Sequence, residues 1–253
     1  MTVKKLSDMK KTLILAAALL VSFTVLAQKE ATRKLSSFSE ISAHEGIQVH
    51  LKQGSSEEAK IKVEGNISMD EVLTEVSGGK LKIHLEDNNY RNIDVEVWVT
   101  YKSLTAVSAS SAADIDSESR IVTSGNFKVS VSSAGDIDLD VKANSIDIKA
   151  SSAGDITLKA ETSSIDASAN SAGSIEISGT AKSLDVSVNS SGDFEGFDLS
   201  AETAEVSASS GGSAEVNVSE QLNARASSGG SVKYKGNPRM DISSNSGGSI
   251  RKS

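Results

Sequence analysis

Apolar and polar residues alternate along most of the chain after its first 40 positions. In the first part, the alternation occupies four short segments, residues 47–52, 59–64, 81–86 and 93–99, which turn-forming residues separate. A period of two is typical of a strand with one buried face. Residues 68–76 are the exception, because Ser68 can cap a short helix and Glu71 follows it by three residues. We expect a small antiparallel β-layer with one helical turn.

From about residue 104 a repeat organises the same alternation. Each copy opens on an apolar residue, and the openings are spaced by 18 to 20 residues: Phe127, Ile146, Ile165, Leu184, Ala204, Leu222 and Met240. A looser copy opens near Thr105. Such a period predicts a solenoid, whose coils bury their apolar faces against one another. Each copy holds two short strands, which predicts two parallel sheets lying face to face.

Alternation also predicts which side chains form the core. In one copy we expect the inward set to be Ile146, Ile148, Ala150, Ile156, Leu158 and Ala160. Aromatic residues make up only 4% of the chain, which fits a thin core shared by stacked strands.

A recurring phrase, Ser-Ser-Ala-Gly-Asp-Ile at residues 132–137 and 151–156, joins the two strands of a copy. Its glycine is expected to provide a corner with positive φ, at Gly135, Gly154, Gly173, Gly192, Gly212, Gly230 and Gly248. The serine two residues earlier is expected to bond nearby backbone or the equivalent serine of the next coil. This serine occurs at Ser111, Ser133, Ser152, Ser171, Ser190, Ser210, Ser228 and Ser246. The alternative is a functional ladder of hydroxyl groups.

The first 27 residues have the form of an export signal. Lysines at 4, 5, 10 and 11 precede an uncharged run at 12–26, and Val25-Leu26-Ala27 provides small residues for cleavage near Ala27. A membrane anchor is the alternative, although the run is shorter than the roughly 20 residues of a spanning helix. We expect a secreted, periplasmic or cell-surface protein without membrane insertion after cleavage. With no cysteine, the chain has neither disulfides nor a cysteine-linked lipid.

The net charge of the chain limits the kinds of partner that we expect. Cleavage would take a net +3 from the −8 of the whole chain and leave about −11. Nucleic acid and anionic lipid would be repelled, so neither is expected as a partner. Divalent cations, basic proteins and neutral glycans stay open.

Two acidic ladders are the candidate chemistry. Directly after the corner glycine lie Asp136, Asp155 and Asp193, with Asp114 in the first copy. A second set lies one residue into each first strand, at Asp147, Asp166, Asp185, Glu205 and Asp241. Stacked carboxylates can bind Ca²⁺, but a charged face that keeps the strands soluble is the simpler interpretation. We therefore expect no catalytic residue, no bound cofactor and no metal site beyond a calcium-binding use of the Asp136, Asp155 and Asp193 ladder.

Three histidines, His44, His50 and His84, all precede the repeats, and we interpret them as parts of solvated strand faces. Without histidine or cysteine in the repeats, a Ser-His or Cys-His nucleophile is not expected there.

Several motifs resemble one known family. They are Phe38-Ser-Glu-Ile41, residues 47–54, Leu81-Lys-Ile83, the Ser-Ser-Ala-Gly-Asp-Ile repeats and Val232-Lys-Tyr-Lys-Gly-Asn-Pro238. With them the mature chain resembles the putative auto-transporter adhesin, head GIN domain family, found mainly in exported proteins of Bacteroidota. One departure is the absence of a proline before the first repeat, at residues 101–104. The resemblance implies a β-helical, adhesin-like envelope protein and provides no catalytic residues.

These observations predict an all-β protein in which a single-stranded parallel β-helix of about 19-residue coils follows a small antiparallel β-layer. The expected parts are a signal peptide at 1–27, an N-terminal β-strand region of the head domain at 28–103 and solenoid repeats at 104–253.

We expect a non-enzymatic protein whose repetitive surface binds a glycan or protein partner. One alternative is a calcium-assisted polysaccharide-cleaving enzyme that uses an acidic ladder and a base such as Lys149 or Arg225. The other is a purely structural envelope component. If the last coil near Arg251 is uncapped, its edge predicts homo-oligomers through coil ends.

Overall fold

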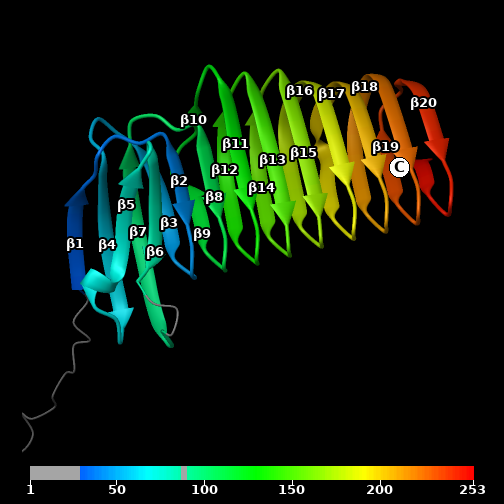
Figure 1. Ribbon diagram of the computed structural model, residues 1–253. Helices are drawn as coiled ribbons and strands as arrows, with labels where there is room; N and C mark the ends of the chain where they lie inside the picture. Colours follow the sequence, from blue (N-terminus) through cyan, green and yellow to red (C-terminus); the bar gives the residue numbers. More distant parts are fainter. Residues whose placement is uncertain (1–28, 87–89) are drawn as a thin grey trace, which may run out of the picture.

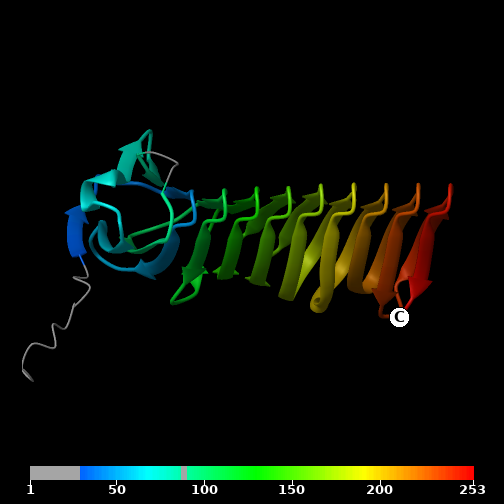
Figure 2. The same ribbon diagram turned by 90° about the horizontal axis from the view of Figure 1, so that it is seen from below.

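The computed structural model describes residues 29–86 and 90–253, and the expected signal peptide lies outside them. The strands lie side by side along one axis, from the N-terminal region at one end to the last coil at the other (Figure 1). Seen from below, the repeat coils form a straight stack beside a wider N-terminal region (Figure 2). Across the described residues, no helix combines the length and the apolar character needed to span a membrane.

Each repeat coil contributes to two parallel sheets. The first sheet contains the strands that precede each corner: β8 (Ala106–Ala109), β11 (Asn126–Val131), β13 (Ser145–Ser151), β15 (Ser164–Asn170) and β20 (Arg239–Ser244). The second sheet contains the strands that follow each corner: β9 (Asp114–Ser117), β12 (Asp136–Lys142), β14 (Asp155–Glu161), β19 (Ser231–Lys235) and β21 (Ser249–Lys252).

Some strands belong to both sheets. Three long strands bend from the second sheet of one coil into the first sheet of the next: β16 (Ser174–Val188), β17 (Asp193–Ala208) and β18 (Ser213–Ala226). A short strand, β10 (Ile121–Val122), pairs with the end of β12. The predicted solenoid with coils of about 19 residues is therefore confirmed.

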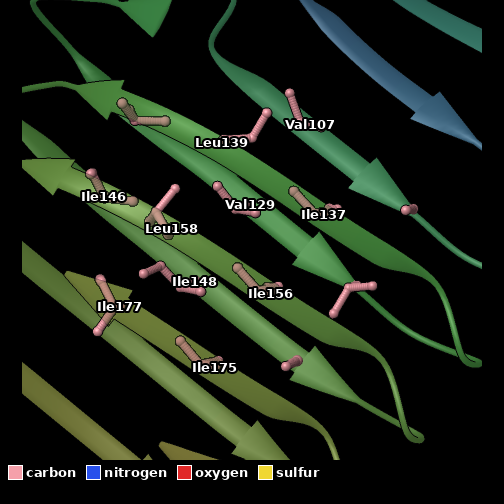
Figure 3. Close-up of a cluster of buried hydrophobic side chains, with 14 of the residues drawn as sticks. Val107, Val129, Ile137, Leu139, Ile146, Ile148, Ile156, Leu158, Ile175 and Ile177 are labelled. Carbon is pink, nitrogen blue, oxygen red and sulfur yellow. The ribbon is translucent and has the colours of Figure 1, made fainter. Parts of the chain in front are cut away.

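Neighbouring coils pair in parallel register, so equal positions stack into apolar ladders. Ile137, Ile156 and Ile175 are direct partners in consecutive coils and are at most 1% exposed. Figure 3 shows these side chains together with Ile146 and Ile148 of the first sheet. All of the predicted inward set is buried. Each buried isoleucine contributes roughly 1.5–3 kcal/mol, so the stack is held together by many similar contacts between coils.

The corner between the two sheets differs from the prediction. Positive φ angles fall on the two residues before the repeated glycine, as at Ser152 (53°) and Ala153 (59°), while Gly154 has no positive φ. Two successive left-handed residues form a type I′ turn. The Gly154 N–H closes this turn by donating to the Ser151 carbonyl at 3.1 Å. The expectation that glycine provides the positive φ is therefore wrong.

The repeated glycine is required because backbones approach closely at the corner. A Cβ at Gly192 would lie 2.3 Å from the Ala169 carbonyl oxygen of the preceding coil, well inside van der Waals contact. Corner amides are also paired between coils: the Ala153 N–H donates to the Ser171 carbonyl at 3.2 Å. This pairing stabilises left-handed serine and alanine, which would otherwise cost about 1–2 kcal/mol per residue.

The corner serines do not behave as expected either. All eight are exposed, and within the described residues their hydroxyls make no hydrogen bond with backbone or with the next serine. Their hydroxyl groups face solvent along one edge of the stack. The short side chain therefore suits an exposed left-handed position rather than a local hydrogen bond.

The head region, our name for the described residues up to 103, extends the solenoid before capping it. The strands β2 (Glu40–Ala43) and β3 (Gln48–Gln53) pair in parallel with β8 and β9. On their other side they pair in parallel with β6 (Lys80–Leu85) and β7 (Ile93–Tyr101). The order in the stack thus differs from the order in the chain, because β2 and β3 are inserted between later strands.

Antiparallel pairing completes the far end of the head region. The strand β4 (Glu58–Gly65) pairs with β7, β1 (Lys29–Lys34) pairs with β4, and β5 (Val72–Ser77) pairs with β6. The predicted helix is only one 3₁₀ turn, η1 (Met69–Glu71), in which the Ser68 N–H donates to Glu71 Oε2 at 2.5 Å. The predicted antiparallel layer is confirmed, and two parallel pairs of strands, β6 with β2 and β7 with β3, lie between it and the solenoid.

In the last coil the inward-facing positions are no longer buried. Met240 and Ile242 are 47% and 46% exposed, although they align with buried Leu222 and Ala224 of the preceding coil. No further strand of the described chain pairs with the outer edge of β20 or β21. Association of two molecules through coil ends stays a prediction.

Candidate functional site

The predicted ladder after the corner forms one line on the outer face of the second sheet. We call it the corner row: Asp114, Asp136, Asp155, Ser174 and Asp193. Asp136 lies directly between Asp114 and Asp155, whereas Ser174 separates Asp155 from Asp193. Paired parallel strands lie about 4.8 Å apart, so the first three carboxylates repel one another across the sheet.

A second row of mostly charged residues lies beside the corner row, and the sequence pattern did not predict it. The next outward position on the same strands forms the middle row: His50, Asp116, Asp138, Thr157, Glu176, Glu195, Glu215, Lys233 and Arg251. Their spacing could have indicated the row, because each of these residues lies two positions beyond the corner-row position of its strand and therefore faces outward as well. The residue type varies from coil to coil, however, so the row cannot be found by searching for a repeated residue.

The second predicted ladder lies on the outer face of the first sheet. We call it the first-sheet row: Asp147, Asp166, Asp185, Glu205, Asn223 and Asp241. All of its members except Asp241 line a shallow groove of about 560 Å³, together with hydroxyl-bearing residues such as Ser164 and Ser183. The two predicted ladders therefore occupy different sheets and form two separate rows rather than one site.

Repulsion and partial burial change the acidity of several members. Partial burial first, and the neighbouring carboxylates second, raise the pKa of Asp114 and Asp136 above the usual range. The same two causes raise the pKa of Asp185 in the first-sheet row and of Glu195 in the middle row. A row of carboxylates that resist ionisation is stabilised by any bound cation or basic partner.

Calcium binding would need carboxylates that converge on one point. Over the ranges 29–86 and 90–253, no three acidic or histidine side chains are grouped as metal ligands. The reason is geometric, since outward side chains of one row leave the sheet in parallel from positions about 4.8 Å apart. A calcium-binding use of Asp136, Asp155 and Asp193 stays a prediction, with only Asp136 and Asp155 adjacent.

The bases suggested for an enzymatic alternative are not combined with the corner row. Lys149 and Arg225 lie on β13 and β18 in the first sheet, whereas the corner row lies on the second. Arg225 Nη1 is also paired with Glu205 Oε1 at 3.2 Å.

The histidines contact more partners than the sequence suggested. His50 Nδ1 lies 2.5 Å from Asp116 Oδ2, and His84 Nδ1 lies 3.0 Å from the Leu85 carbonyl oxygen. Both are on outward strand positions, as predicted, but each is more than half buried by its neighbours.

His44 lies at the junction of head and repeats, where a Ser-His pair was not expected. Its Nδ1 is 2.7 Å from the hydroxyl oxygen of Ser110, which belongs to the first copy of the repeat. Burial first, and Lys82 second, lower the pKa of His44, so a neutral ring is favoured. In the described part of the chain, no acidic side chain hydrogen-bonds this ring, so the third member of a triad is missing.

Comparison with known proteins finds one matching family and several solved structures with a similar fold. The family model described as "Putative auto-transporter adhesin, head GIN domain" matches residues 37–238. No curated protein matches the sequence at a significant level.

Solved structures resemble most of the described chain. A putative adhesin from Parabacteroides distasonis has a TM-score of 0.83 and 22% identity, covering 89% of this chain and 97% of that one. A putative adhesin from Parabacteroides merdae has a TM-score of 0.81 and 19% identity, covering 89% and 96%. A putative lipid binding protein from Parabacteroides distasonis has a TM-score of 0.77 and 23% identity, also covering 89% and 96%. At these identities the likeness concerns the fold alone.

Proposed function

Because the chain belongs to the putative auto-transporter adhesin, head GIN domain family, we propose that it is an exported, non-enzymatic protein that binds a glycan or protein partner at the cell envelope. The proposed binding surfaces are the outer faces of the two parallel sheets. This role includes the expected secreted, periplasmic or cell-surface location after cleavage near Ala27.

The observation that carries the proposal is the strict register of polar rows across consecutive coils. In the first-sheet row, Asp147, Asp166, Asp185 and Glu205 are direct partners on neighbouring strands. A partner with a matching repeat can therefore contact several equivalent groups at once, which increases overall affinity without requiring a strong single contact. The carboxylates favour basic groups on the partner, and their attraction should weaken with salt.

A purely structural role and a polysaccharide-cleaving activity remain the two alternatives to test. The first predicts neither binding nor cleavage. The second predicts an unsaturated product when polyuronates are incubated with the protein and calcium.

The decisive experiment is a binding assay with the mature chain on glycan arrays and on cells, in physiological salt and calcium. We expect binding that falls at least about tenfold when Asp147, Asp166 and Asp185 are all replaced by serine. A second triple variant tests the other face and replaces Asp136, Asp155 and Asp193 by serine, as occurs naturally at Ser174. Loss in one triple variant alone identifies the binding face. Absence of binding to every glycan and cell type would contradict the proposal.

A further inference from the structure

The single tryptophan of the chain lies on the surface of the head region. Trp98 occupies an outward position on β7, between the fully buried Val97 and Val99, and the residue is partly exposed. Its direct partners across the sheet are Lys60 on β4 and His50 on β3. The Lys60 Nζ lies 5.8 Å from the centroid of the indole ring, and the His50 ring lies 5.3 Å away, tilted by 34°.

Beside Trp98 the surface is hollowed into a groove of about 480 Å³, a volume within the usual range for small-ligand sites. Trp98 and Thr100 line it from β7, Lys60 from β4, and Ser55 and Ser56 from the loop between β3 and β4. We call it the Trp98 groove. It lies in the head region, at the other end of the molecule from the late coils.

The loop that borders the groove is fixed to the end of β7. The Gly54 N–H donates to the Tyr101 carbonyl at 2.8 Å, and Gln53 Nε2 donates to the Lys102 carbonyl at 3.1 Å. A Cβ at residue 54 would lie 2.5 Å from Thr100 Cγ2, so a larger residue there would displace the Thr100 side chain. A border held by the sheet lowers the entropy cost of binding, because little has to be ordered when a ligand arrives.

The charges around the groove cancel. Lys52 and Lys60 line it together with Glu58 and Glu118, giving two charges of each sign, and Lys52 Nζ is already paired with Glu118 Oε2 at 3.2 Å. This balance distinguishes the groove from the acidic rows of the repeats. It disfavours a strongly charged ligand, because either sign would meet as much repulsion as attraction.

Hydroxyl groups that line the groove are nevertheless available for hydrogen bonds with a ligand. The hydroxyls of Ser55, Ser56 and Thr100 make no hydrogen bond within the described residues. A purely apolar ligand would bury these groups without partners, at a cost of about 1–3 kcal/mol each. The ligand that fits is therefore neutral, rich in hydroxyl groups and provided with one apolar face for the indole.

We infer that the Trp98 groove binds a neutral hexose unit of a glycan, with the apolar C–H face of the sugar ring against the indole of Trp98. The sugar hydroxyls then bond the free hydroxyls of the loop and the paired charges at the border. The inference shares with the proposed function only the expectation of a surface ligand, because it concerns a different region and a different chemistry from the acidic rows.

Tryptophan fluorescence tests this inference directly, since all tryptophan emission comes from Trp98. The mature chain is titrated with neutral hexose oligosaccharides of the cellulose, maltose and mannan types, and with polygalacturonate as a charged comparison. We expect a saturable change in emission with at least one neutral oligosaccharide and a weaker response to polygalacturonate. No saturable response to any of the neutral oligosaccharides would overturn the inference.

Variants separate the groove from other surfaces, with calorimetry as the measurement. Trp98→Ala removes the stacking face, and Ser56→Phe fills the groove from an exposed loop position; both should weaken neutral glycan binding at least about tenfold. Phe197→Ala is the matched control, because Phe197 is also partly exposed but lies in the repeats under Lys235 Nζ, at 4.1 Å. That variant should bind as the native protein does. Thermal unfolding of each variant checks that its fold is retained.

The outcomes also separate this inference from the proposed function. If glycan binding survives in both Trp98→Ala and Ser56→Phe but is lost in the triple serine variants, the groove is not the site and the inference fails, while the proposed function stands. If the groove variants lose glycan binding and the triple serine variants retain it, the inference stands without the acidic rows.

Discussion

The head and the repeats build the same corner with different residues. In the head the turn residues are Glu45 (φ 64°) and Gly46 (φ 70°), followed by the fully buried Ile47. In the repeats the turn residues are a serine and an alanine, serine or glycine, and glycine follows at the position of Ile47. The two regions therefore share the backbone conformation of the turn, but they differ in the space available for the side chain that follows it.

That space is smaller in the repeats than in the head, and in the repeats it varies from coil to coil. The position after the turn is Ile47 in the head and the buried Ala113 in the first copy, and from then on it is glycine. A Cβ at Gly135 would lie 3.0 Å from the nearest atom of the preceding coil, at Gly173 2.5 Å and at Gly192 2.3 Å. Uniform coils approach each other more closely than the irregular strands of the head, so the repeats depend on backbone contact and the head on side-chain packing.

The largest expected effect tests this difference in space with alanine. Gly192→Ala should lower the free energy of unfolding by about 3 kcal/mol or more, because its Cβ meets backbone that cannot move away. Gly135→Ala should cost about 1 kcal/mol, since a contact of 3.0 Å can relax. Urea denaturation of the three variants, including Gly46→Ala, measures the series.

Gly46→Ala is the control for backbone strain. Gly46 has a positive φ, but its Cβ would meet nothing within 4 Å, so the cost should stay at or below about 1 kcal/mol. Equal costs at all three positions would show that strain, and not close approach, decides where glycine is needed.

A second prediction concerns the side-chain core of the head. The Tyr101 hydroxyl is buried and has no hydrogen-bond partner in the described chain, and burial raises the pKa of Tyr101. Tyr101→Phe should therefore stabilise the protein by about 1 kcal/mol, because the unsatisfied hydroxyl is removed. The control is Tyr234→Phe in the repeats, where the tyrosine is 8% exposed and little change is expected. A loss of stability in Tyr101→Phe, measured by thermal unfolding, would reveal a hydrogen bond to water.

The smallest expected effect concerns the corner row. The folded-state pKa of Asp136 is raised, so its ionisation destabilises the folded protein at neutral pH, and this penalty is relieved as the pH falls through that pKa. Asp136→Ser should therefore stabilise by a few tenths of a kcal/mol at neutral pH in low salt, since solvent screens an exposed carboxylate. The gain should shrink at acid pH and in high salt.

Ser174→Asp is the mirror-image control for this prediction. It adds a carboxylate between Asp155 and Asp193 and should destabilise under the same conditions by a similar amount. Stability profiles against pH at two salt concentrations compare both variants. A gain in Asp136→Ser that persists at acid pH would contradict an electrostatic origin.

The sequence by itself determined the repeat, the inward set and the two ladders. Strict alternation with a fixed period leaves one arrangement in which Ile146, Ile148 and Ile156 are all buried, and in that arrangement the outward Asp136 and Asp155 must line up. The local pattern was enough to predict these features because each coil packs against a coil of similar sequence. The same pattern also predicted the antiparallel strands of the head.

Only the tertiary structure decided the features that depend on what lies across from a residue. The insertion of β2 between β6 and β8, the tight contact at Gly192 and the pairing of His44 with Ser110 all join segments distant in the chain. The Trp98 groove arises in the same way, from β7, β4 and a loop held by Gly54. Alternation states which side of a strand a residue faces, but the distance to its neighbour depends on how the coils pack.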